Sequence, residues 1–103
     1  MIALVVHLEL APSHEAAFDE LMRTTLDGIR ALEPGTLVYA LTADPARPAI
    51  RILLEVYRDE AAFRAHEAQP HVGAFLDARG ALLARPAEVD WLEVRDLATG
   101  PAA

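Results

Sequence analysis

The sequence of 103 residues contains no cysteine. This absence excludes disulfide bonds, zinc sites built from thiolates and catalysis by a thiol nucleophile. It is consistent with a reducing compartment, and we expect a soluble, cytoplasmic protein. Aromatic residues are also scarce, with one Trp, two Tyr and three Phe. Each of them is therefore expected to have a definite place in the core or in a site.

Basic residues are too few to balance the acidic ones, and the net charge is −7 with an isoelectric point near 4.9. Nucleic acids and anionic membrane surfaces both need a basic patch, so neither is an expected partner. No apolar run approaches the ~20 residues that cross a bilayer. The apolar first segment is interrupted by His7 and Glu9 and lacks a basic leader and a cleavage site. It is predicted to be a strand and not a signal peptide.

Common catalytic signatures are missing as well. The sequence has no Gly-rich phosphate loop, no nucleophile elbow and no closely spaced set of His and Asp residues. His66 and His71 are five residues apart across Pro70, which is weak spacing for metal ligands. We expect no bound metal.

The periodicity of apolar residues predicts a single α+β domain over residues 1–98, followed by a short flexible tail at 99–103. The order is β-α-β-β-α-β, which is typical of a ferredoxin-like sandwich with a four-stranded antiparallel sheet. The second helix is expected to be broken near Pro70. The predicted elements are strands at 2–10, 36–43, 49–58 and 87–97, and helices at 13–33, 59–67 and 71–83.

Both faces of the predicted sheet are apolar, although the two helices cover only one of them. A second copy of the same sheet is the simplest cover for the other face, so we expect a homodimer with twofold symmetry. The aliphatic even-numbered faces of the first and third strands are expected to form the dimer surface. The odd-numbered faces, which carry His7, Glu55 and Tyr57, would then look towards the helices.

The segment from Glu55 to Phe75 holds most of the candidate site residues. It brings a carboxylate and a phenol at a strand end close to His66 and His71 in an otherwise aliphatic domain, which is typical of a pocket for proton chemistry. His7 has no ordinary structural reason to be mid-strand. In contrast, His66 also suits a helix end, His71 also suits a helix start, and Glu55 also suits a salt bridge with Arg51.

Further candidates come from the aromatic residues and one arginine. Tyr39 is either a site residue or a core aromatic, as is Tyr57. Phe63 and Phe75 belong to the buried stripes of the second helical region. Arg79 lies in the middle of the last stripe, where it either snorkels to the surface or binds an anion.

Several short motifs occur in the order and spacing of a known family. They are Glu33-Pro34-Gly35-Thr36-Leu37-Val38-Tyr39, then Glu55-Val56-Tyr57-Arg58-Asp59-Glu60-Ala61-Ala62, then Ala65-His66 and Pro70-His71. In these motifs the chain resembles the antibiotic biosynthesis monooxygenase family, over nearly its whole length. Members of that family are dimeric α+β barrels, which agrees with the expected homodimer.

The resemblance implies a small apolar pocket in this chain. In such a pocket, several members of the family oxidise quinols or aromatic polyketides with molecular oxygen and use no flavin, haem or metal. His66 or His7 would be the base, and Tyr57 would hydrogen-bond the substrate oxygens. The implied substrate contacts are Tyr39, Glu55, Phe63, His71, Phe75 and Arg79. The expected partners are a small aromatic or quinone-like molecule and molecular oxygen, and no cofactor is expected.

Two other functions stay open. One branch of the family isomerises a phosphorylated signalling sugar, so an isomerase of a small phosphorylated or hydroxylated ketone is an alternative. The other is a non-catalytic dimer that binds a hydrophobic metabolite, because this fold does not fix a function.

Overall fold

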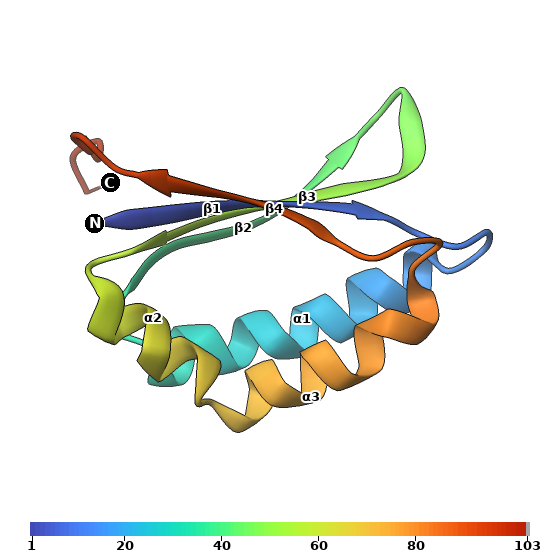
Figure 1. The fold of residues 1–103 in the computed structure, drawn as a ribbon, viewed down its shortest axis with the longest axis horizontal. Helices are drawn as coiled ribbons and strands as arrows, with labels where there is room; N and C mark the ends of the chain where they lie inside the picture. The colour runs from blue at the N-terminus through green and yellow to red at the C-terminus, as the bar shows by residue number, and fades with distance from the viewer. Residues whose placement is uncertain (103) are drawn as a thin grey trace.

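The computed structural model describes residues 1–102 as one antiparallel sheet with helices packed against one of its faces (Figure 1). The predicted ferredoxin-like α+β fold is confirmed. The strands are β1 (Ile2–Glu9), β2 (Thr36–Asp44), β3 (Arg47–Tyr57) and β4 (Glu88–Glu93). The helices are α1 (Glu15–Leu32), α2 (Glu60–Glu67), α3 (Pro70–Arg79) and the short 3₁₀ helix η1 (Gly80–Leu82).

Local sequence signals explain where the helices begin and end. The α1 helix buries Phe18, Met22 and Ile29 on one stripe and ends before Glu33, where Pro34 follows. The α2 helix begins after Asp59, whose carboxylate accepts a hydrogen bond from the amide of Ala62. Pro70 is the first residue of α3, a position where its missing N–H group costs nothing. The predicted break at Pro70 is therefore confirmed.

The strand order is β2-β3-β1-β4, which puts β1 and β3 in the centre and β4 at an edge. The β2–β3 hairpin turns more tightly than predicted, because Asp44 already pairs with Arg47. The Asp44 carboxylate closes this turn by accepting hydrogen bonds from the amide of Ala46 and the side chain of Arg47. The last strand ends four residues earlier than expected.

The register between β1 and β3 corrects one prediction about the faces of the sheet. Leu4 lies opposite Glu55 and Leu8 lies opposite Arg51, so even positions of β1 share a face with odd positions of β3. That shared face packs against the helices, since Leu4, Leu8, Arg51 and Glu55 are all buried. The expectation that His7 looks towards the helices is wrong. The two strands were assumed to match in parity, whereas the antiparallel pairing offsets them by one.

The outer face of the sheet carries mostly aliphatic side chains in the single chain. Pairing places these residues on it: Ala3, Val5, Val38, Ala40, Ile50, Ile52, Leu54, Val56 and Leu92. Leu54 and Leu92 are 42% and 52% exposed. The structure therefore has one face covered by its own helices and one apolar face without such a cover.

The remaining features concern the ends of the chain and its helices. Residues 94–102 form no helix or strand, and Ala103 at the end of the expected tail lies outside the described residues. None of the helices in residues 1–102 combines the length and the apolar character that crossing a membrane requires.

Candidate functional site

A cavity of about 240 Å³ lies between the inner face of the sheet and the α2–α3 segment. It is smaller than the ~300–1,000 Å³ of most ligand pockets, which favours a ligand of one or two rings. The lining is mainly apolar, with a few polar groups among it. The lining residues are Leu4, Val6, Tyr39, Glu55, Phe63, His66, Glu67, Val72, Phe75, Leu76, Arg79, Val89 and Trp91.

Glu55 is a buried carboxylate in the wall of this cavity. Its side chain points from β3 to the helical side and accepts a hydrogen bond of 2.5 Å from the hydroxyl of Tyr57. Burial raises the pKa of Glu55 to about 7, although the Tyr57 hydrogen bond and the charge of Arg79 act in the opposite direction. At neutral pH this carboxyl group is therefore able both to accept and to donate a proton.

The two tyrosines support Glu55 in different ways. Tyr57 is fully buried behind Glu55 and does not line the cavity, whereas Tyr39 lines it directly. Burial, and then the charge of Glu55, raises the pKa of both phenols well above the ordinary value. Both hydroxyls therefore stay protonated; that of Tyr57 donates to Glu55, and that of Tyr39 is available as a donor in the cavity.

Arg79 brings a positive charge to the same cavity. Its guanidinium carbon lies 5.6 Å from the centre of the Phe75 ring. Burial lowers the pKa of Arg79, while Tyr39 and Glu55 raise it. No carboxylate in residues 1–102 lies within salt-bridge distance of this guanidinium. Arg79 is thus placed to attract an anionic oxygen of a ligand.

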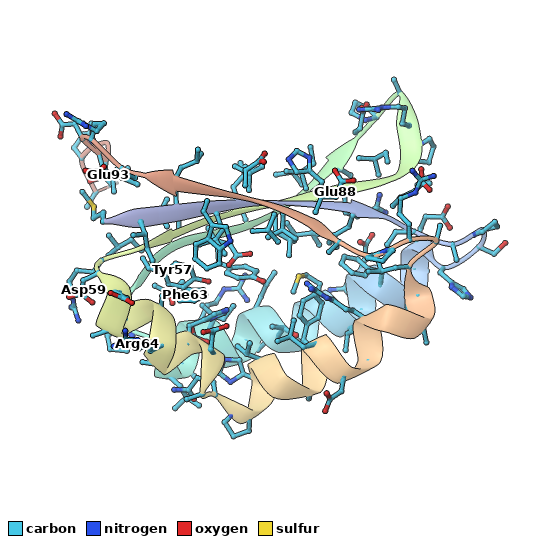
Figure 2. The ribbon with its side chains drawn as sticks, in the orientation of Figure 1. Tyr57, Asp59, Phe63, Arg64, Glu88 and Glu93 are labelled. Atoms are coloured by element: carbon cyan, nitrogen blue, oxygen red, sulfur yellow. The ribbon has the colours of Figure 1, made fainter. Side chains whose placement is uncertain are left out.

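Aromatic rings form one wall of the cavity. The Phe63 ring packs edge-on against Trp91 at 5.1 Å and against Tyr57 at 5.2 Å. Figure 2 shows Tyr57 of β3 and Phe63 of α2 in the space between sheet and helices. Arg64, the neighbour of Phe63 on α2, is exposed. Because Trp91 belongs to β4, this edge strand forms part of the cavity wall.

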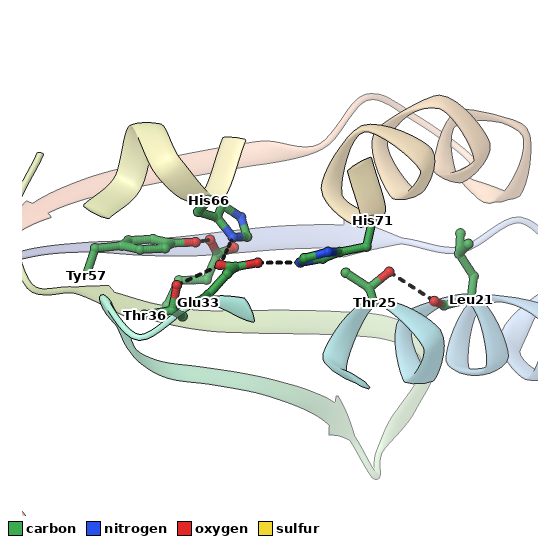
Figure 3. A network of polar contacts seen from close by, with 8 residues as sticks. Leu21, Thr25, Glu33, Thr36, Tyr57, His66 and His71 are labelled. Atoms are coloured by element: carbon green, nitrogen blue, oxygen red, sulfur yellow. Dashed lines mark hydrogen bonds and ion pairs between the residues drawn. The ribbon is translucent and has the colours of Figure 1, made fainter. Parts of the chain in front are cut away.

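Behind the cavity, one buried carboxylate joins two histidines (Figure 3). Glu33 follows α1, and its Oε1 atom lies 2.6 Å from Nδ1 of His66, while its Oε2 atom lies 2.5 Å from Nε2 of His71. The hydroxyl of Thr36 donates a third hydrogen bond to Oε1. We call Glu33, His66 and His71 the His–Glu–His cluster.

The hydrogen bonds of this cluster keep Glu33 ionised. Burial alone would raise the pKa of Glu33, but the hydrogen bonds from Thr36, His71 and His66 outweigh it and lower the pKa below its ordinary value. The side chain of Glu33 is only 2% exposed. A buried anion of this kind fixes the orientation of both imidazole rings.

Gly28 makes room for the second histidine. A Cβ atom at Gly28 would lie 2.4 Å from Cγ of His71, which is closer than any real contact. A glycine inside a helix costs about 1 kcal/mol relative to alanine. The glycine in α1 is therefore explained by the position of the His71 ring.

The structure gathers most of the predicted site residues around one cavity. Six of them line it: Tyr39, Glu55, Phe63, His66, Phe75 and Arg79. Tyr57 lies one contact behind the lining, through Glu55, and His71 lies two contacts behind it, through Glu33 and His66. His7 is the exception, since it lies on the outer face and its Nε2 atom is 2.9 Å from Oδ2 of Asp90.

The alternative readings of two residues are also decided. Glu55 makes no salt bridge with Arg51, because the Arg51 guanidinium binds Asp19 of α1 through two hydrogen bonds. His66 is more than a helix end, since it is buried and bonded to Glu33.

Sequence reasoning missed Glu33 and Trp91. The sequence marks Glu33 only as the last residue of a predicted helix and the first of a short motif, and 33 residues separate it from His66. The one available signal was a carboxylate next to Pro34-Gly35, at the end of the apolar stripe of α1. In residues 1–102 no group of three or more His, Asp or Glu residues is arranged to hold a metal ion.

The packing of His71 on Gly28 gives a prediction about stability. Gly28→Ala is expected to destabilise the protein by up to ~2 kcal/mol, because overpacking costs ~1–3 kcal/mol and the better helix propensity offsets only ~1 kcal/mol of it. Gly73→Ala is the matched control, since nothing lies within 4 Å of a Cβ atom there. It is expected to stabilise by ~0.5–1 kcal/mol. Urea unfolding of both variants measures the difference, and equal effects would contradict the account.

The raised pKa of Glu55 gives a second prediction. An acid with a higher pKa in the folded state stabilises the fold at low pH, and this contribution is lost as the pH rises from about 4.5 to about 7. A shift of this size corresponds to roughly 3 kcal/mol. Glu55→Gln stays neutral, so its stability relative to the wild type is expected to improve between pH 4.5 and 7.5. Urea unfolding at both pH values tests this, and a constant difference between the two proteins would refute it.

Comparison with known proteins places the chain among related sequences. The profile of the antibiotic biosynthesis monooxygenase family matches residues 1–78. An uncharacterised protein of Synechocystis is 26% identical over 98 residues, which is 95% of this chain. The match covers 66% of that relative, so this chain spans slightly less than two thirds of its length.

Two solved structures share the whole fold. A Caulobacter crescentus protein, named provisionally as an antibiotic biosynthesis monooxygenase, superimposes with a TM-score of 0.87 at 26% identity. The alignment covers 92% of this chain and 90% of that one. A Mycobacterium tuberculosis protein gives a TM-score of 0.86 at 26% identity, with 95% and 98% covered.

Proposed function

The chain belongs to the antibiotic biosynthesis monooxygenase family, and on that premise we propose that it oxidises a small phenol or quinol with molecular oxygen, without a bound cofactor. The observation that carries this proposal is the cavity itself. It combines an aromatic wall with Glu55, a buried carboxyl group whose pKa of about 7 suits proton transfer at neutral pH.

The chemistry needs an anionic substrate. Dioxygen reacts slowly with closed-shell molecules, but a phenolate is electron-rich enough to pass it an electron. The protein must therefore remove a proton, stabilise the resulting anion and exclude water. Each of these tasks has a candidate group in the cavity.

We assign the removal of the proton to His66, whose ring lies 5.6 Å from the ring of Tyr39 in the cavity wall. Its Nδ1 atom is bonded to Glu33, so the Nε2 atom is the one left for the substrate. Arg79 and the hydroxyl of Tyr39 stabilise the phenolate oxygen. Glu55 then supplies the proton that the reduced oxygen needs, because near pH 7 about half of it is protonated.

The proposed reaction balances without another reductant. A phenol or quinol with a free C–H group ortho or para to its hydroxyl loses an O–H proton, and the anion transfers one electron to dioxygen. The radical pair combines to a peroxide at that carbon, and the loss of water from this peroxide leaves a quinone. One oxygen atom enters the product and the other leaves as water, and the substrate supplies all four electrons.

Oxygen uptake on a panel of naphthols and naphthoquinols tests the proposal. We expect the wild type to exceed the rate of autoxidation, and His66→Gln and Glu55→Gln each to lose at least ~100-fold, the usual contribution of a general acid or base. Arg64→Ala is the matched control, because this exposed α2 residue pairs only with Glu60. It is expected to keep the wild-type rate. Uptake that stays at the autoxidation rate for every compound would exclude the oxygenase.

Arg79 favours a second candidate function. A cationic side chain without a carboxylate partner, beside two groups able to exchange protons, also suits an isomerase of a small phosphorylated or hydroxylated ketone. Such a reaction moves a proton between carbons and consumes no oxygen. Proton exchange with deuterated solvent at the ketone's α-carbon, without oxygen uptake, would favour the isomerase over the oxygenase. Ligand binding with neither reaction would favour a binding protein.

We further propose that a second copy of the chain covers the outer face of the sheet. The support is the aliphatic surface of that face, whose centre includes Leu54 at 42% exposure. Sheet packing through this face would bury the apolar side chains and would leave the helices outside.

The variant Leu54→Glu is expected to convert the dimer to a monomer, because each copy would bury a carboxylate in the apolar interface. Leu32→Glu is the control, since Leu32 is 58% exposed on the helical side. Sedimentation equilibrium measures the mass of both variants. A wild type that sediments as a monomer at micromolar concentration would contradict the proposal.

A further inference from the structure

Each histidine of the His–Glu–His cluster gives one ring nitrogen to Glu33 and keeps the other, which we call its outward nitrogen. His66 lines the cavity and gives its Nδ1 atom to Glu33, so its Nε2 atom remains for the cavity. His71 gives its Nε2 atom to Glu33, so its Nδ1 atom remains; this atom lies beside Gly28 of α1, 2.6 Å from where a Cβ atom there would be, and the side chain is 12% exposed. In residues 1–102 the only fully buried polar side-chain atom without a partner is Nδ1 of His14. Neither outward nitrogen of the cluster is therefore sealed from solvent or ligand.

A second hollow reaches the cluster from the outside. It measures about 200 Å³, and both Glu33 and His66 border it, together with Arg58, Asp59 and Gln69. His66 thus lies between the cavity and a hollow at the surface. Glu33 connects His66 to His71 on the next helix. His71 does not border this hollow, and its partly exposed side chain is a separate contact of the cluster with solvent.

We propose that His66 and His71 share one positive charge through Glu33, so that a proton taken from the substrate by His66 is balanced by a proton released to solvent from His71. The inference deepens the proposed function, since it depends on His66 as the base. It adds His71 and Glu33 as residues that act through His66.

The physical reason is the charge balance of a buried site. One carboxylate neutralises one imidazolium, whereas two imidazolium ions around it would leave a net positive charge out of water. When the substrate O–H bond breaks and an N–H bond forms at Nε2 of His66, the repulsion between the rings favours loss of the Nδ1 proton of His71. The two N–H groups that face Glu33 do not move, and no electrons are transferred. The charge of the cluster is the same before and after the step.

Other charged and titratable groups surround the cluster and belong to the same electrostatic balance. Each of them lies on an element that packs against it or borders one of the adjacent hollows. They are Arg30 of α1, Tyr39 of β2, Glu55 and Tyr57 of β3, Arg58 and Asp59 before α2, Glu67 of α2 and Arg79 of α3. Among these, none is within hydrogen-bond distance of Glu33, so the two imidazole rings are its direct charged partners.

Nitrogen-15 NMR of the imidazole rings tests the shared charge without any substrate. In His71→Gln the whole carboxylate serves His66, so the titration midpoint of His66 is expected to move up. In Glu33→Gln the anion is lost, so that midpoint is expected to move down. A purely structural role for the cluster does not predict opposite shifts. His7→Gln is the control, because this histidine lies on the outer face of the sheet, and it should leave His66 unchanged.

The His71→Gln result decides alone if Glu33→Gln does not fold, since His71 is at the start of a helix and is partly exposed. An unmoved His66 in this variant, or a shift downward, would overturn the proposal. Opposite shifts in the two variants would support it.

A kinetic measurement tests the release of the proton to solvent. In dilute buffer the oxygen uptake of His71→Gln is expected to fall about tenfold below the wild type, with a loss in kcat and an unchanged KM. Added imidazole, a small diffusible proton acceptor, is expected to restore most of that rate while the wild type does not respond. A loss that imidazole does not restore would refute the release through His71. Absence of uptake in the wild type would instead exclude the oxygenase, and the NMR titrations would still decide the shared charge.

Discussion

The buried contact between Glu33 and the two histidines is the constraint on which the site depends. Glu33 stands where α1 ends and β2 is about to begin, His66 is in the last turn of α2, and His71 is in the first turn of α3. A single carboxylate therefore joins the end of α1 to the junction between α2 and α3. Removing both histidines would leave the buried charge of Glu33 without a charged partner, and a loss of that kind typically costs ~3–5 kcal/mol. Gly28 is part of the same arrangement, because any side chain there would displace His71.

The site contains two buried glutamates whose environments act in opposite directions. Glu33 receives three hydrogen bonds that keep its pKa below the ordinary value, whereas Glu55 receives one and has its pKa raised to about 7. Such a divided pair is the usual way in which one fold provides an anion and a proton donor at the same pH. In the proposed mechanism Glu33 orients the base, and Glu55 faces the cavity. The division of roles follows from the number of donors around each carboxylate and not from the residue type.

The sequence was sufficient for the order of elements, the break at Pro70 and six of the cavity residues, since periodicity and local caps determine these features. It was insufficient for the faces of the sheet. Alternation shows which residues of a strand lie together, but the pairing register decides which face of the next strand they join. His7 was misplaced for this reason. Glu33 was missed because its partners are far away in the chain, and no local pattern reports a contact between a helix end and two later helices.

The most direct test of this account is a carbon-13 NMR titration of the glutamate side-chain carboxyl groups between pH 3 and 9, with Glu55→Gln used for assignment. We predict one carboxyl group that titrates near pH 7 and disappears in Glu55→Gln, and a second, that of Glu33, that is still ionised when the exposed glutamates are protonated. If both groups titrated together with the exposed glutamates near pH 4.5, the cavity would hold no group poised for proton transfer. The proposed division of roles would then be wrong.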